Sequence, residues 1–414
     1  MLSSGEHGRS TMRDLGFFRY MLHAVPGTVW AVGISSLLIN TATSASFIGV
    51  ALYLKITCGV SIGMIGCLEA IVEAIAYITR MFSGAISDYF KRRKPLMILG
   101  FAMIIVSKPL LAMSRVYATV LVARGIDRIG NGMQASPRDA LISDSAPHNV
   151  KGACFGLRQS LAVIGSTLGG IGGIVVMRMS DNSFTTLFTL STVPALIAVV
   201  TLIMFVKEEK KTQERGERRK IRLRDLKLLG KHFWMLMVVV TPFMLSRFSE
   251  VFISLHACGN FGLDIAYGTS ITVIYNLMST AVSYPIGKLS DRIGRVRLLL
   301  LGFIILLFAH LLIGFAMNLY MVLFGTILWG CQRGIADGLI ATMVSDYVPK
   351  DLRGTGFGVY YFVVSFTTAI SSATAGAVSQ LYGEAYAFIM GACCCGVAGA
   401  TLYASRKFLQ ITES

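Results

Sequence analysis

Long apolar runs separated by short polar segments fill almost the whole chain. We count twelve runs of about 20 or more mostly apolar residues, the length that an α-helix needs to cross the hydrocarbon core of a bilayer. Their approximate bounds are 28–51, 60–86, 95–113, 116–141, 153–177, 184–206, 233–256, 265–287, 297–317, 319–345, 355–380 and 385–404. The pattern predicts an all-α integral membrane protein with twelve transmembrane helices.

The polar segments between these runs repeat from one half of the chain to the other. Gly84 and Asp88 have counterparts in Gly287 and Asp291, 203 positions later. The stretches 144–156 and 346–358 share the pattern D-x-x-P-x-x-x-[KR]-G-x-x-F-G. Two such matches at nearly one spacing predict two pseudo-symmetric six-helix bundles in the same orientation. A parallel repeat of this kind occurs in one large class of transporters.

The numbers of lysine and arginine residues predict the orientation. With both chain ends in the cytoplasm, the inside segments hold 27 of these bases and the outside loops hold 3. Positive charge favours the cytoplasmic side of a membrane. The predicted parts are a cytoplasmic tail (1–26), a six-helix bundle (27–206), a basic cytoplasmic linker (207–232), a second six-helix bundle (233–405) and a cytoplasmic tail (406–414).

The composition agrees with a membrane protein and excludes other classes. The chain is 54% hydrophobic and only 14% charged, whereas a soluble domain carries about 25% charged residues. The net charge of +16 does not indicate nucleic-acid binding, because the bases gather in short segments between apolar runs. The cysteines show no metal-ligand spacing, so neither a metal nor a cofactor is expected.

Asp88 and Asp291 each follow the inner end of an even-numbered helix, where a carboxylate needs a partner. In each half, a base and a glycine (151–152 and 353–354) open the fifth helix. A helix N-terminus carries partial positive charge and unpaired N–H groups. We therefore expect each aspartate to dock on the helix of the other half, which would hold the cytoplasmic side shut.

Ionisable residues inside the predicted spans are the candidates for proton coupling or for a substrate cavity. Each costs about 2.5–3.5 kcal/mol on insertion scales, and such residues usually face the interior of the bundle. The candidates are Glu69, Glu73, Arg124, Asp127, Arg128, Arg247, Glu250, Arg333 and Asp337. Pairs of arginine and aspartate that only neutralise one another are the structural alternative.

Glu73 is the leading candidate for a proton site, followed by Asp127 and Glu250. Glu69 and Glu73 lie one helical turn apart and share a face, so their repulsion favours a proton on one of them. Arg80 is assigned to the inner loop contacts rather than to a cavity. Two further residues are expected to have no such role: Lys108 would extend towards the outer surface, and His310 has no obvious partner.

The inner loops resemble the signature of the major facilitator superfamily, G-x-x-x-D-R-x-G-R-R-K. The first copy departs from it at Tyr89 and Lys91, whereas the second copy matches closely. The matching residues are Gly84, Asp88, Arg92, Arg93 and Lys94 in the first copy, and Gly287, Asp291, Arg292, Gly294, Arg295 and Arg297 in the second. The resemblance covers essentially all twelve helices and implies that these residues form a cytoplasmic gate. The repeated stretches look like those of a broad bacterial group whose substrates are mostly unassigned.

Two further motifs of this family bear on coupling. R-x-x-Q-G-x-x-A corresponds to Arg128, Asn131, Gly132 and Ala135, with asparagine in place of glutamine. In related exporters this arginine is thought to take part in proton coupling. The glycines of 165–173 keep only part of the drug-antiporter spacing, and packing of helices through small residues is the simpler explanation for them.

Together these features predict a secondary active transporter of a small organic solute, coupled to protons and working by alternating access. The helix 4 motif and the partial glycine spacing of helix 5 favour an efflux antiporter, whereas intramembrane charges of both signs favour uptake or facilitated passage of a polar or anionic metabolite. No P-loop occurs, so ATP is not expected to drive transport directly. The chain also lacks H-E-x-x-H, and a single catalytic centre would not need the internal repeat, which argues against an enzyme. The pattern is compatible with a passive channel or a non-transporting sensor as well.

The expected partners are a small-molecule substrate, protons and the lipid bilayer. Nucleic acid is not expected, and the fold can work as a monomer. The predicted location is the inner (plasma) membrane of a bacterium, because the chain has no N-x-[ST] acceptor site and the group that it resembles is bacterial.

Overall fold

The apolar runs form helices because a backbone in hydrocarbon must satisfy its N–H and C=O groups within its own segment. The structure, a computed structural model, describes residues 25–56, 58–59, 62–181, 183–206, 208, 223–249, 251–261 and 265–410. The α-helices are α2 (Gly27–Ile56), α3 (Ile62–Phe90), α4 (Lys94–Met113), α5 (Tyr117–Ser145), α6 (Lys151–Met179), α7 (Phe184–Phe205), α8 (Lys231–Leu245), α9 (Val251–Phe261), α10 (Ile265–Ile293), α11 (Arg295–Gly314), α12 (Leu319–Tyr347), α13 (Arg353–Tyr382) and α14 (Glu384–Gln410). Short 3₁₀ segments, η1 (His148–Val150), η2 (Leu223–Leu229) and η3 (Lys350–Leu352), precede α6, α8 and α13.

Six of the described helical segments are long and apolar enough to cross a membrane by composition alone. They are Lys94–Met113, His148–Met179, Phe184–Phe205, Arg295–Gly314, Lys350–Tyr382 and Glu384–Leu409. Other long helices carry polar residues that they turn inward. For example, α5 buries Arg124, Asp127 and Arg138 within the protein. The protein is thus all-helical, as the pattern of apolar runs predicted.

The seventh predicted span is interrupted, so the expectation of one helix over 233–256 was wrong. Helix α8 ends at Leu245, and α9 begins at Val251. Two side chains bind carbonyl groups that the break releases: Nε2 of His310 lies 2.9 Å from the Ser246 oxygen, and the Ser371 hydroxyl donates to the Leu245 oxygen at 2.6 Å. Irregular backbone is tolerated at membrane depth where it is buried in protein or lines a cavity.

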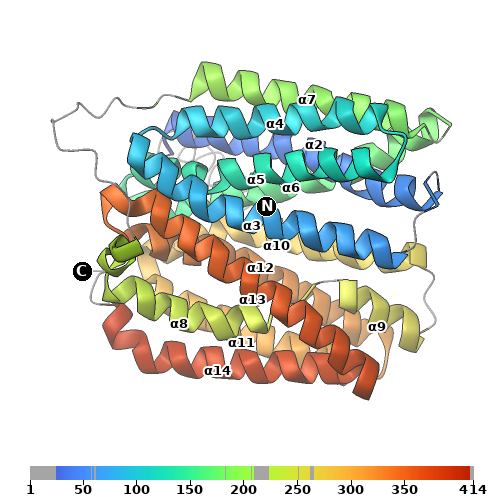
Figure 1. The fold of residues 1–414 in the computed structure, drawn as a ribbon. Helices are drawn as coiled ribbons and strands as arrows, with labels where there is room; N and C mark the ends of the chain where they lie inside the picture. Colours follow the sequence, from blue (N-terminus) through green and yellow to red (C-terminus); the bar gives the residue numbers. More distant parts are fainter. Residues whose placement is uncertain are drawn as a thin grey trace, which may run out of the picture.

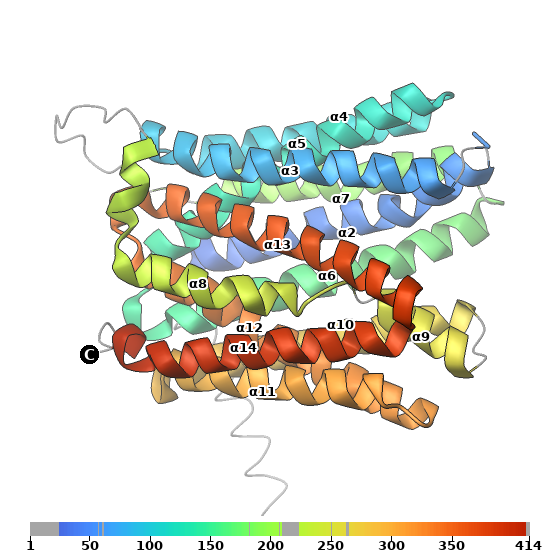
Figure 2. The same ribbon diagram turned by 60° about the horizontal axis from the view of Figure 1, so that its bottom comes forward.

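The helices form two groups that follow the order of the chain (Figure 1). Helices α2–α7 pack mainly on one another, and so do α8–α14. The two groups meet chiefly where α3 packs on α13 and where α6 packs on α10. Figure 2 shows α13 running beside α3. In both pairs the second helix of one half contacts the fifth helix of the other, as the internal repeat requires.

One end of the bundle holds the loop at 91–93, the start of α6, the start of α8 and the start of α13, and we call it the basic end. Here the halves approach closely through glycines. A Cβ atom added to Gly84 would collide with the carbonyl of Gly354, and one added to Gly152 would lie 2.5 Å from the Gly287 oxygen. Only glycine lets the backbones come this near.

Asp88 binds the N-terminus of α13 at the basic end. Its carboxylate accepts hydrogen bonds from the backbone N–H of Gly354 at 3.0 Å and of Thr355 at 2.5 Å, and from the Thr355 hydroxyl at 2.7 Å. Arg93 pairs with the same carboxylate at 2.5 Å. A carboxylate at a helix N-terminus contributes about 0.3–2 kcal/mol, with the larger value in buried settings.

Asp291 repeats this contact at the N-terminus of α6. It accepts hydrogen bonds from the backbone N–H of Gly152 at 3.0 Å and of Ala153 at 3.1 Å. The expected docking of each aspartate on the other half is therefore present in both copies. Its part in opening and closing stays a prediction. The flanking Arg92 and Arg292 are exposed.

Ion pairs between the halves surround the two aspartates. Lys151 lies 3.0 Å from Asp346, which Arg295 also contacts, and Arg353 lies 2.7 Å from Asp144. The hydroxyl groups of Ser143 and Ser345 meet directly between them. We call this set of contacts, together with the two docked aspartates, the latch.

The chain turns sharply within each copy of the loop motif. Lys91 has a φ of 50° and Gly294, the equivalent residue of the second copy, has a φ of 99°. Left-handed φ values are natural for glycine and uncommon for lysine. The departure of the first copy from the family pattern therefore leaves the turn in place but makes it less favourable.

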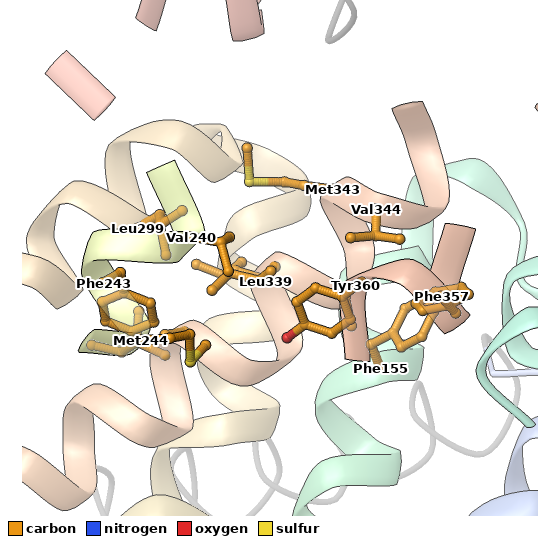
Figure 3. Close-up of a cluster of buried hydrophobic side chains, with 14 of the residues drawn as sticks. Phe155, Val240, Phe243, Met244, Leu299, Leu339, Met343, Val344, Phe357 and Tyr360 are labelled. Carbon is orange, nitrogen blue, oxygen red and sulfur yellow. The ribbon is translucent and has the colours of Figure 1, made fainter. Parts of the chain in front are cut away.

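A layer of apolar side chains lies beside the latch. Phe155 of α6 and Phe357 of α13 occupy matching positions of the repeat, and their ring centroids are 5.9 Å apart. Both side chains are fully buried. Figure 3 shows the two rings together and, one turn further along α13, Tyr360 with its hydroxyl oxygen turned away from them.

Ser143→Cys combined with Ser345→Cys tests the latch directly. Because the two hydroxyls touch, the cysteine pair is expected to form a disulfide in the purified protein. Adding Asp88→Asn and Asp291→Asn removes both charges from the helix N-termini, so cross-linking should slow several-fold as the basic end separates more often. Mass spectrometry of the linked peptide measures the rate. An unchanged rate would show that the aspartates do not hold the halves together; Ser143→Cys alone is the control.

Candidate functional site

A cavity of about 450 Å³ lies between the two halves. Its walls come from α2, α3, α5 and α6 on one side and from α8, α10, α12, α13 and the α8–α9 break on the other. This volume is within the range of small-molecule sites, about 300–1,000 Å³. Five arginines line it: Arg80, Arg138, Arg158, Arg247 and Arg333.

Three of these arginines belong to the N-terminal half, and we call them the N-terminal arginine group. Arg138 of α5 donates to Asp139 at 2.9 Å, and Arg158 of α6 lies 3.8 Å from the same carboxylate. Tyr361 of the other half also donates to Asp139. Asp139 is fully buried, so its charge serves to neutralise part of this group.

Arg80 of α3 is the third member of the N-terminal arginine group. Its guanidinium lies over the rings of Tyr77 and Tyr361, with centroid distances of 5.6 and 5.7 Å. Among the described residues, no carboxylate lies within ion-pair distance of it, and its Nε is buried without a hydrogen-bond partner. The aromatic rings offer a cation–π attraction of about 0.5–2 kcal/mol, but no described carboxylate neutralises the charge of Arg80.

Two arginines of the C-terminal half share Asp337, and we call them the C-terminal arginine group. Arg247, in the α8–α9 break, lies 2.6 Å from this carboxylate, and Arg333, one turn before it on α12, lies at 3.5 Å. Gln159 of the other half donates to Asp337 at 3.3 Å. Arg333 also lies over the ring of Tyr275, 5.1 Å from its centroid.

The described residues around the cavity therefore carry more positive than negative charge. Five guanidiniums face two carboxylates, Asp139 and Asp337, in this part of the protein. Arginine keeps its proton under all ordinary conditions. An anion in the cavity would restore the balance, whereas a cation would add to the excess.

The rest of the wall is polar or aromatic. Amide groups come from Asn40, Asn131 and Gln159, and ring systems come from Phe248, Tyr275, Trp329, Tyr360 and Tyr361. Such a wall provides hydrogen bonds for a polar group and flat surfaces for a carbon skeleton.

A separate group of charges lies outside the cavity, within the N-terminal half. Lys108 binds Asp127 at 2.8 Å, and both side chains are fully buried. Arg124 lies 3.8 Å from Asp127, and Arg128 lies 3.1 Å from Glu73. Here every named acid has a basic partner, which is how a membrane protein tolerates buried charge.

The predicted site residues thus fall into two places. Arg247, Arg333 and Asp337 meet at the cavity, whereas Glu73, Arg124, Asp127 and Arg128 join the separate group. The side chain of Glu69 and the whole of Glu250 lie outside the described residues.

Three smaller expectations were wrong. Lys108 does not extend to the membrane surface, because Asp127 and the Ser46 hydroxyl hold its ammonium group in the interior. Arg80 lines the cavity instead of joining the latch. His310 is not without a partner, since it binds the carbonyl of Ser246 at the helix break.

Three residues that the structure brings to the site were not predicted: Arg138, Asp139 and Arg158. All three lie inside the predicted spans 116–141 and 153–177. The rule that an ionisable residue within a span faces the interior would have found them.

Solved structures similar to this one include transporters of several substrates. The human organic anion transporter MFSD10 superposes with a TM-score of 0.77 at 19% identity, covering 91% of this chain and 99% of that one. The proton:xylose symporter XylE gives 0.72 at 14% identity, with coverage of 93% and 96%. The Escherichia coli fucose:proton symporter FucP gives 0.72 at 12% identity, with coverage of 91% and 98%. At these identities the likeness concerns the fold.

Relatives by sequence come from an archaeon and from mycobacteria. An uncharacterized MFS-type transporter of Methanocaldococcus jannaschii is 28% identical over 348 residues, which cover 80% of this chain and 84% of the relative. An uncharacterized protein of Mycobacterium tuberculosis is 24% identical over 336 residues, 79% of each chain. The family model of the Major Facilitator Superfamily matches residues 32–265 and 233–410. With its twelve spans, its internal repeat and these matches, the chain belongs to the major facilitator superfamily.

Proposed function

We propose that this protein is a secondary active transporter of a small organic anion and that it works by alternating access. The observation that carries the proposal is the excess of arginine over carboxylate around the cavity. Arginine is the residue best suited to bind carboxylate and phosphate groups, because its planar donors match their oxygens in pairs. Of the substrate classes compatible with the sequence, an anion is the one that this chemistry favours.

The latch supports alternating access. Among the described residues, hydrogen bonds and ion pairs connect the two halves in two regions. They lie either at the cavity or between the cavity and the basic end. We assign the basic end to the cytoplasm, because lysine and arginine gather there. In this conformation the cytoplasmic side is closed, and the other state requires the latch to separate while the outer parts of the halves approach.

The charge of the substrate bears on the direction of transport. A potential that is negative inside drives a monovalent anion outward by about 2.3 kcal/mol per 100 mV. Efflux therefore needs no other driving force, whereas accumulation needs at least one proton carried with each anion. We propose efflux in exchange for protons, with proton-coupled uptake as the alternative that the same cavity allows.

The similar structures make the proposal reasonable without deciding it. MFSD10 is described as an organic anion transporter, and XylE and FucP are described as proton symporters. Anion transport and proton coupling are thus both found on this fold. For the present chain they rest on the arginine groups, on Glu73 of α3 and on Asp127 of α5.

Arg80→Gln tests the anion. Wild-type protein in liposomes is expected to transport members of a panel of labelled carboxylates and organic phosphates but not neutral sugars of similar size. Removing the uncompensated guanidinium should lower anion uptake at least tenfold, since a hydrogen bond to a charged group is worth about 1.5–3 kcal/mol. Arg178→Gln is the matched control, because Arg178 is exposed in the last turn of α6. Equal flux of sugars and anions would contradict the proposal.

Glu73→Gln tests proton coupling. Glu73 is the partly exposed member of its ion pair with Arg128, so it is the described carboxylate of that group to which a proton has easiest access. With a pH-sensitive dye inside the liposomes, anion flux in wild type should change the internal pH, and the variant should move the anion without that change. If the variant still moves protons, Glu73 has a structural role and Asp127 becomes the residue to change.

A further inference from the structure

From a difference between the two halves we infer that the C-terminal half binds the phosphate group of an anionic membrane lipid, in a pocket between α11 and α14 at the basic end. The pocket has a volume of about 300 Å³, and its walls are Val296, Arg297, Leu300, Leu402, Tyr403 and Arg406. None of these six residues lines the cavity between the halves. The inference therefore goes beyond the proposed function and does not depend on the transported substrate.

Two guanidiniums line this pocket without an acid to neutralise them. Arg297 lies in the first turn of α11, and Arg406 lies near the end of α14. Among the described residues, no carboxylate lies within ion-pair distance of either one. Arg406 instead stacks on Tyr403, with its guanidinium 3.7 Å from the ring centroid. Because arginine keeps its proton under all ordinary conditions, the pocket carries unbalanced positive charge.

The internal repeat supplies a reference for this pocket. At the spacing of 203 found for the loop motif, Lys94 of α4 is the counterpart of Arg297. Helices α7 and α14 match at a spacing of 200, since Leu202 and Leu402 are both fully buried. The corner between α4 and α7 is thus the counterpart of the corner between α11 and α14.

In the N-terminal half the chain supplies its own anion to this corner. The Glu208 carboxylate, just after α7, accepts hydrogen bonds from the backbone N–H of Arg93 and, at 3.2 Å, from that of Lys94. The Lys94 ammonium group donates to the carbonyls of Ile203 and Val206, at 2.7 Å each. The start of α4 and its lysine therefore both find their acceptors at the end of α7.

The corresponding end of α14 is built differently. Helix α7 ends at Phe205, so the chain can turn back onto α4, whereas α14 continues to Gln410. At the spacing of 200, the position that matches Glu208 is Phe408. The Phe408 ring stacks on His232 of α8, with ring centroids 4.5 Å apart. An apolar side chain that packs on another helix thus replaces the carboxylate.

The matching backbone donors lie in the wall of the pocket. The two N–H groups that bind Glu208 correspond to those of Val296 and Arg297. The N–H groups of a first helical turn have no partner within the helix, and the positive end of the helix dipole favours an anion there. A phosphate group in the pocket can occupy the place that Glu208 has in the other half, with Arg297 and Arg406 matching its charge.

The surroundings of the pocket indicate a lipid as the source of the phosphate. Helices α11 and α14 lie side by side at the edge of the bundle (Figure 2). From Arg297 one face of α11 continues at helical spacing through Leu301, Ile304 and Phe308, which are all about half exposed. Acyl chains can lie along this apolar face while the headgroup occupies the pocket. Basic pockets between helices on the cytoplasmic side suit the headgroups of anionic lipids.

The test titrates short-chain lipids against the purified full chain in detergent. Dioctanoyl phosphatidylglycerol is compared with dioctanoyl phosphatidylcholine, which has the same chains and a phosphate but no net charge, and with inorganic phosphate. Affinity is read from the rise in melting temperature with ligand concentration at constant ionic strength. The anionic lipid should bind about tenfold more tightly than the zwitterionic lipid, the usual worth of one charged hydrogen-bonded contact.

Variants of the pocket locate the binding. Arg297→Gln and Arg406→Gln should each weaken binding of the anionic lipid several-fold, and together they should remove its advantage over phosphatidylcholine. Lys407→Gln is the matched control, because Lys407 is an exposed base next to Arg406 that does not line the pocket; it should bind lipid as the wild type does. Arg297 is exposed, so Arg297→Gln alone decides the matter if the double variant is unstable.

Three outcomes would overturn the inference. Equal affinity for the two lipids, or an advantage that the double variant keeps, would show that the pocket does not recognise the anionic headgroup. Inorganic phosphate that binds as tightly as the anionic lipid would make this a site for soluble phosphate. Lipid binding that appears only in Glu413→Gln would assign the pocket to the acidic end of the chain itself (411–414). The anion proposed for the cavity is unaffected by any of these results.

Discussion

An arginine cannot stand uncompensated inside a membrane protein without a reason, and this constraint organises the molecule. Desolvated guanidiniums require carboxylates, aromatic faces or hydrogen-bond acceptors nearby. At the latch and in the group around Asp127, bases and acids are matched side chain to side chain. Around the cavity the described bases and acids are not matched. Among the described residues, the arginine that has no carboxylate within ion-pair distance, Arg80, lies at the cavity.

The internal repeat explains why the halves hold together by doubled contacts. Asp88 binds the N-terminus of α13, and Asp291 binds the N-terminus of α6 with the same geometry. The close backbone contacts between glycines beside them also occur in both copies. Each contact is modest, because hydrogen bonds and charge–dipole attraction at a helix end contribute only a few kcal/mol. Modest contacts in matching positions can form a stable closed end that still separates, which a large apolar interface would resist.

The sequence was sufficient for features that depend on local pattern. Apolar length predicted the spans, and a repeated aspartate beside a repeated helix start predicted the docking, since both signals are read along the chain. The cavity depends on how each helix is rotated and tilted, and packing decides this. Hence Lys108 was placed at the surface when Asp127 holds it inside, and Arg138 and Arg158 were overlooked. The break after Leu245 was also missed, because the partners that stabilise it, His310 and Ser371, come from distant helices.

The pair of Phe155 and Phe357 has a consequence for leakage. A chain of side-chain hydroxyls, carboxylates and water from the cavity to the latch would conduct protons past the transport cycle and dissipate the gradient across the membrane. The centroids of the two rings are 5.9 Å apart. Along α6, Phe155 lies between Gln159, which lines the cavity, and Gly152, which binds Asp291 at the latch. The two rings form an apolar layer between the polar cavity and the charged latch. Because aromatic rings have no hydrogen-bonding side-chain groups, this pair offers a proton no path from the cavity to the latch through its own side chains.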